Sequence, residues 1–307
     1  MERGLIDWVV FWAIVALLFY IDLSISEKRK GRIPLKTSLI WSAVWIGAAL
    51  LFNAFIYYDL GKDKAIEFLT GYLVEKSLSV DNLFVFLLIF QVMNVKPEQQ
   101  PHVLKWGILG AIVFRIIFIL AGVGLINLFE PIIFVFAAIL LYAAYKMAFG
   151  AEHKIDVENN WLVKLASRYL NFDPEYTGRK FFISKEHKRF ATPMFITLLL
   201  IESSDIVFAV DSIPAIIAIT KDTFIIISSN IFAILGLRAL YFALAGVVDL
   251  FVYLKYGVAI ILFYVGVKII ISEWYHIPTE ISLTVILVVL TGSVVLSLIF
   301  KKKKSKE

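Results

Sequence analysis

The stretch Glu75-Lys76-Ser77-Leu78-Ser79-Val80-Asp81-Asn82-Leu83-Phe84-Val85-Phe86 places two carboxylates, two hydroxyls and an amide in a run that is otherwise apolar from Phe68 to Phe90. That run is long enough to cross a bilayer as a helix. A second run, Glu202-Ser203-Ser204-Asp205-Ile206-Val207-Phe208-Ala209-Val210-Asp211, sets three carboxylates between the apolar blocks 195–201 and 213–219. Charged side chains at bilayer depth are costly, so these two runs constrain the fold more than any other part of the chain.

The composition is that of a polytopic helical membrane protein. Of the 307 residues 60% are hydrophobic, mean hydropathy is +0.85, and several apolar runs reach roughly 20 residues. The net charge of +5 comes from basic residues in short loops and in the tail 301–304. This distribution indicates membrane topology and lipid contact, and it argues against nucleic acid as a partner. With no cysteine, the chain offers no disulfide and no thiolate ligand.

Nine membrane spans are predicted, at about 5–24, 37–58, 66–93, 103–127, 131–149, 192–219, 222–248, 250–272 and 281–300. With the amino terminus outside, 21 of the 30 Lys and Arg residues fall in cytoplasmic segments and only four fall outside. Because cytoplasmic loops carry the excess of basic residues, the expected orientation is N-outside and C-inside.

The chain contains an internal repeat. Arg115 lies 34 residues after Asp81, and Arg238 lies 33 residues after Asp205. The repeat unit is three spans long, so the second copy is expected to enter the membrane from the opposite side, as in transporters with inverted repeats. The predicted fold is therefore all-α and integral to the membrane. Its parts are peripheral spans in 1–64, a first three-helix repeat in 65–149, a cytoplasmic loop in 150–190, a second repeat in 191–272, and the last span with a basic tail in 273–307.

The five acidic residues of the two runs need compensation. Each charge at a helix centre costs about 2.5–3.5 kcal/mol, so five would cost on the order of 15 kcal/mol if left unpaired. They must face one another, a cation, or Arg115 and Arg238, or else be protonated. A cluster of salt bridges that only locks helices together is one alternative. For the two arginines, the role of a fixed counter-ion is favoured over that of a gate.

Helical spacing favours a cation site. On an ideal helix Glu75, Ser79 and Asn82 share one face, and Glu202 and Asp205 share another, while the remaining acidic residue of each run points about 120° away. All of them converge only if the helices unwind locally. The expected ligands are Glu75, Asp81, Asn82, Glu202, Asp205 and Asp211. The expected supporting residues are Ser79, Ser204, Arg115, Arg238 and Pro214, whose ring clashes with the carbonyl of Val210 and would open the helix there.

Such a set of oxygen donors suits Mg²⁺, Ca²⁺ or Mn²⁺ rather than Zn²⁺ or Cu²⁺. The four histidines lie in loops or at loop edges, with no H-E-x-x-H pair and no base at membrane depth, so the chain is not expected to be an enzyme. Release of a divalent cation from crowded carboxylates can be coupled to proton uptake, which is the chemistry of a cation/proton antiporter.

The two motifs, with D-x-x-F-A-x-D-S-x-P-A complete from Asp205 to Ala215, resemble the signature stretches of the TerC family, named for tellurium resistance. The resemblance runs from the first span to the last, and length and span count are similar to the Alx-type branch. It implies a multi-pass protein of the bacterial plasma membrane, or a thylakoid relative, that exports manganese. Tellurium handling is expected to be indirect.

Two hypotheses follow. The first is an exporter with Mn²⁺ as its transported substrate, or Ca²⁺ in its place, and with no permanently bound cofactor. The second is a non-transporting membrane scaffold or assembly partner whose charges are structural locks. The expected partners are the divalent cation and the lipid bilayer, with a homo-oligomer left open.

Overall fold

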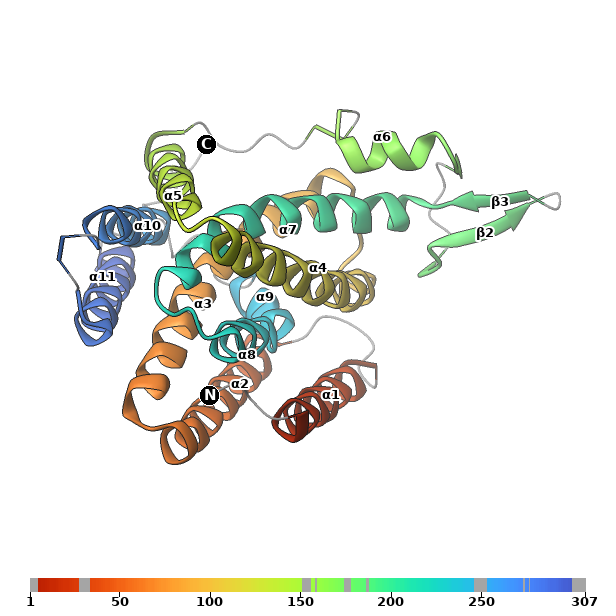
Figure 1. The fold of residues 1–307 in the computed structure, drawn as a ribbon. Coiled ribbons are helices and arrows are strands. Elements are labelled where there is room, and N and C mark those ends of the chain that lie inside the picture. Colours follow the sequence, from red (N-terminus) through yellow and green to blue (C-terminus); the bar gives the residue numbers. More distant parts are fainter. Residues whose placement is uncertain are drawn as a thin grey trace.

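The fold is known from a computed structural model, which describes residues 5–27, 34–150, 156–157, 159–173, 178–185, 188–245, 253–272, 274–275 and 277–299. Within these ranges a few residues, Asp81 among them, are described by their backbone alone. The described chain is a bundle of long helices with a small extension of one short helix and three short strands (Figure 1).

The helices of the bundle are α1 (Leu5–Glu27), α2 (Leu35–Leu60), α3 (Lys62–Val92), α4 (Gln100–Leu128), α5 (Ile132–Phe149), α7 (Pro193–Ile217), α8 (Thr223–Ile234), α9 (Leu237–Ala245), α10 (Leu254–Ile271) and α11 (Thr279–Ile299). In the described part of the chain, seven helices are long and apolar enough to cross a membrane: α2, α4, α5, α7, α8 with α9 counted as one, α10 and α11. The predicted class, an all-α integral membrane protein, is confirmed. The count of nine spans and their orientation stay predictions.

The two charged runs form neighbouring helices at the centre of the bundle. Helix α3 carries the first run and α7 the second, and the two pack against each other. Helix α3 also packs on α8, just as α7 packs on α4, and α5 packs on α10 (Figure 1). The first three-helix unit corresponds to α3, α4 and α5, and the second to α7, α8 with α9, and α10. If the two units trade places, the same set of pairings results. The inverted orientation of the two units stays a prediction.

The peripheral helices cover this centre. Helix α2 packs on α3 and α9, and α11 packs on α3 and α10. An aromatic cluster fixes α2 at this position, where Phe52 stacks on Phe232 with ring centroids 4.5 Å apart and also contacts Phe11 and Phe68. Aromatic pairs of this kind add to the burial of apolar area. The central helices are therefore held by packing from both outer sides.

The segment between the two units contains α6 (Trp161–Ser167), β1 (Asn171–Phe172), β2 (Phe182–Lys185) and β3 (Lys188–Ala191). The strand order is β1-β3-β2, with β1 parallel and β2 antiparallel to β3. Gly178 lies between β1 and β2, which do not pair with each other. Strands β2 and β3 pair after that glycine, and their connection, 186–187, lies outside the described residues.

The helix interruption lies elsewhere than predicted. Helix α7 continues through Pro214 to Ile217, so the local unwinding expected beside Asp211 does not occur. Helix α3 is also continuous through its acidic run. The break falls instead between α8 and α9, where Leu235 has a ψ of 130° and Gly236 a φ of 81°. A glycine tolerates this left-handed backbone because it has no Cβ.

Candidate functional site

Glu75 of α3 and Arg115 of α4 form an ion pair inside the bundle, and their side chains are 1% and 3% exposed. The Nη1 atom of Arg115 also donates to the hydroxyl of Ser212, at 3.2 Å, and to Oδ1 of Asn230, at 3.1 Å. Ser79, one turn beyond Glu75, donates to its Oε1 at 3.4 Å. One guanidinium therefore connects α3, α4, α7 and α8. The ion pair is the contact that a counter-ion role for Arg115 requires, and that role stays a prediction.

Glu202 and Asp205 bring further negative charge to the same region from α7. Both are buried, and Asp205 interacts electrostatically with Arg115 and with Glu75, while Glu202 interacts with Asp205. Gly110 of α4 lies directly against Glu202, because a Cβ atom there would overlap all three atoms of the carboxyl group. The glycine thus lets α4 approach the carboxylate closely.

Several polar atoms near this ion pair have no hydrogen-bond partner among the described residues. They are Oε2 of Glu75, Oε2 of Glu202 and Nε of Arg115. Buried polar atoms are satisfied in the great majority of cases, so each exception calls for an explanation such as an ion or a water. Two carboxylate oxygens with no protein donor are chemically suited to bind a cation.

The other predicted residues lie around this cluster or away from it. Asn82 is buried on α3, and the hydroxyl of Ser204 donates to the carbonyl of Leu200 at 2.9 Å. Asp211 is partly buried on α7. Asp81 belongs to α3, and its side chain lies outside the described residues. Among the side chains that are described, no three from His, Cys, Asp and Glu gather closely enough to hold a metal ion. The ligand set as a whole stays a prediction.

Arg238 pairs with an acidic residue outside the two charged runs. Its Nη2 atom pairs with Oδ2 of Asp22 in α1, at 2.8 Å, and donates to the carbonyl of the same residue. Asp22 was missed by the sequence reasoning, although it is an acidic residue at the end of the first apolar run. The two arginines occupy corresponding positions in the repeat. Arg115 pairs with Glu75 of α3, whereas Arg238 of α9 pairs with Asp22 of the outer helix α1.

Three further polar residues were also missed. Ser212 and Asn230 share Arg115 with Glu75, and the nitrogen of Lys76 donates to the carbonyl of Ala233 at 3.1 Å. The signal was available, since Asn230 and Lys76 are polar residues in apolar runs. In a membrane such residues rarely lack a partner or a function.

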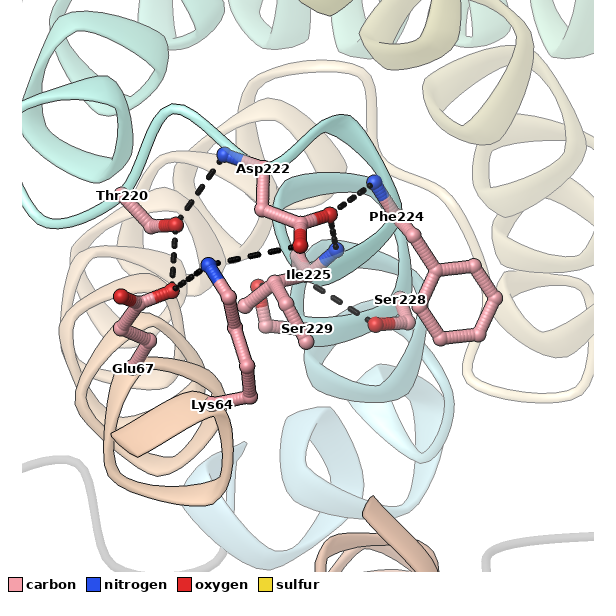
Figure 2. A network of polar contacts seen from close by, with 8 residues as sticks. All are labelled: Lys64, Glu67, Thr220, Asp222, Phe224, Ile225, Ser228 and Ser229. Atoms are coloured by element: carbon pink, nitrogen blue, oxygen red, sulfur yellow. Dashed lines mark hydrogen bonds and ion pairs between the residues drawn. The ribbon is translucent and has the colours of Figure 1, made fainter. Parts of the chain in front are cut away.

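A separate polar network joins the start of α3 to the start of α8 (Figure 2). The nitrogen of Lys64 lies 2.8 Å from Oε2 of Glu67 and 3.4 Å from Oδ2 of Asp222. Thr220 donates to Glu67 at 2.6 Å. Asp222 caps α8 by accepting from the backbone N–H of Phe224 at 3.0 Å. In the predicted orientation this network lies on the outer face and connects the two repeats.

Comparisons with known proteins extend over most of the chain. The sequence model of the family described as "Integral membrane protein TerC family" matches residues 60–305. An uncharacterized membrane protein of Rickettsia bellii is 43% identical over 295 residues, which cover 96% of this chain and 98% of the relative. An uncharacterized membrane protein of Myxococcus xanthus is 42% identical over 95% of this chain and 92% of its own length.

Alx of Escherichia coli (strain K12) is 42% identical over 94% of this chain and 93% of its own length, and its name gives membrane-bound redox modulation as a provisional role. No solved structure matches. The family match covers well over half of the chain, and the identities to these relatives extend over nearly its whole length. The chain therefore belongs to the TerC family of integral membrane proteins.

Proposed function

We propose that this protein exports a divalent metal cation across the plasma membrane, with Mn²⁺ as the substrate, through the carboxylates of α3 and α7. The observation that carries the proposal is the set of buried carboxylates near Arg115: Glu75 pairs with it, Asp205 interacts with it, and Glu202 interacts with Asp205. Among the described residues, one oxygen of each glutamate has no hydrogen-bond donor. In a salt-bridge cluster that only stabilises the fold, each of these oxygens would accept a hydrogen bond or pair with a cationic side chain, because unsatisfied buried carboxylates destabilise a fold.

The chemistry of the donors favours a hard cation. Carboxylate, amide and hydroxyl oxygens suit Mg²⁺, Ca²⁺ and Mn²⁺, and the chain has no cysteine to offer a softer ligand. Arg115 supplies a fixed positive charge that keeps the carboxylates tolerable between transport cycles. When the cation leaves, protons can replace part of its charge, so exchange of the cation for protons is the proposed coupling.

The name of the Escherichia coli relative suggests a redox role. In this chain such a role cannot run on thiol and disulfide chemistry, because its 307 residues include no cysteine. Manganese export also accounts for a membrane location and for acidic residues inside the bundle. The scaffold hypothesis is the competing account, and it differs in one consequence: a scaffold tolerates removal of the charges if the protein still folds.

Cellular manganese distinguishes the two accounts. Cells that lack their own exporters would express either the parent chain or an equally abundant Asp81→Asn, Asp205→Asn double variant under manganese load. We expect the parent to lower cell manganese and the double variant to leave it at the level of the empty vector. If the parent itself, confirmed in the membrane, leaves manganese unchanged, the export proposal fails and the scaffold account is favoured. Parallel measurement of calcium tests the alternative substrate.

A further inference from the structure

The break between α8 and α9 leaves backbone groups that need partners. In a continuous helix the carbonyl of Ala233 would accept the amide of Leu237, four residues on. Here α8 ends at Ile234, Leu235 is extended, and α9 begins at Leu237. Within a bilayer every freed backbone group must be satisfied by protein, because no water is present to do so.

Lys76 of α3 satisfies this carbonyl. Its nitrogen donates to Ala233 at 3.1 Å, across a separation of 157 residues in the chain. Lys76 lies next to Glu75, with which it interacts electrostatically. A hydrogen bond from a charged donor is roughly twice as strong as one between neutral groups. The break is therefore anchored from α3 by a charge-assisted bond.

The two neighbouring residues of α3 contact α8 one helical turn apart. Glu75 does so through Arg115, which donates to Asn230, and Lys76 does so directly at Ala233. Asn230 and Ala233 are three residues apart, so both contacts fall within about one turn of the end of α8. The amide of Asn230 is in turn fixed by donation to the carbonyl of Ile226 at 3.1 Å. Displacement of α8 at its last turn would thus move the group that orients Arg115.

We propose that Lys76 is a positioning residue of the carboxylate site: its ammonium holds the α8–α9 break at Ala233 and thereby sets Asn230 and Arg115 against Glu75. The inference deepens the proposed export function and rests on it for its effect on manganese. Its structural part stands on the geometry alone. Lys76 itself needs no contact with the substrate.

The indole of Trp45 in α2 is a natural reporter for the break. It packs directly on Gly236, where an added Cβ would lie 2.6 Å from Cγ of the indole. Protein labelled with 5-fluorotryptophan gives one fluorine resonance for each tryptophan, and the variant Trp45→Phe identifies the resonance of Trp45. This signal reports the position of the break whether or not the protein binds manganese.

The experiment compares Lys76→Met, which removes the donor, with Lys76→Arg, which keeps it. Lys62→Met serves as the control, since Lys62 begins the same helix and its side chain is 67% exposed. Manganese affinity is measured from the loss of the free Mn²⁺ electron paramagnetic resonance signal. We expect Lys76→Met to shift the Trp45 resonance and to weaken Mn²⁺ binding about tenfold. Lys76→Arg should restore much of both, and Lys62→Met should change neither.

The possible failures are distinguishable. An unchanged Trp45 resonance in folded Lys76→Met overturns the inference, and so does a shifted resonance with parental manganese affinity. If the parent binds no manganese but Lys76→Met still shifts the resonance, the anchoring of the break stands and the export proposal fails. Should Lys76→Met not fold, Lys76→Gln, which removes the charge and shortens the side chain, is measured in the same way.

Discussion

Removal of the guanidinium of Arg115 is expected to destabilise the protein strongly. Glu75 would then be a carboxylate 1% exposed without its ion-pair partner, and Ser212 and Asn230 would lose a charged donor. Removal of one partner from a buried pair costs about 3–5 kcal/mol. We therefore expect Arg115→Met to lower the free energy of unfolding by about that amount.

A double-mutant cycle tests whether the stranded charge is the cause. In Arg115→Met, Glu75→Gln the carboxylate of Glu75 is no longer left without its partner, so the double variant should lose less than the sum of the two single losses, with a coupling energy of about 0.5–3 kcal/mol. Unfolding of the purified proteins in detergent micelles, followed by tryptophan fluorescence, gives the four values. Lys62 and Glu280, which are 67% and 51% exposed and 4.0 Å apart, form the control pair. Their coupling should stay below about 1 kcal/mol. Additive losses at Arg115 and Glu75 would refute the reasoning.

Three further predictions concern single positions. Gly110→Ala places a Cβ on the carboxylate of Glu202 and should weaken Mn²⁺ binding in titrations, whereas Gly124→Ala, with nothing within 4 Å, should not. Gly236→Ala adds left-handed backbone strain of about 1–2 kcal/mol and a clash with the neighbouring indole, so its midpoint of thermal unfolding should fall clearly, and a parental midpoint would contradict the account. Asp222→Ala removes the cap of α8 and should cost about 0.5–2 kcal/mol in denaturant titrations, and Asp222→Asn, which can still cap, should cost less.

The sequence predicts the helices of the bundle well because the signal is local. An apolar run of roughly 20 residues has few alternatives in a bilayer, so element type follows from composition. The position of a helix break does not follow in this way. Pro214 has the stronger intrinsic tendency to interrupt a helix, yet α7 continues through it, while α8 ends before Gly236. The tertiary contacts of Lys76 and Trp45 accompany that break, and they come from distant parts of the chain.

The candidate site was only partly predictable for the same reason. The cost of buried charge identified Glu75, Glu202 and Asp205 as residues that need partners, and the repeat identified Arg115 as one. The repeat also suggested the same role for Arg238, which pairs with Asp22 in a helix outside the repeat. Repeats relate backbone positions, but side-chain partners depend on what surrounds each copy.

The central claim is most directly tested by manganese flux in a purified system. Proteoliposomes that contain the parent or Asp205→Asn would receive radioactive Mn²⁺ under an imposed pH gradient, with protein content and folding matched. The account predicts that the parent carries manganese against the direction of proton flow and that Asp205→Asn carries little or none. Equal flux through both proteins, or none through the folded parent, would contradict it.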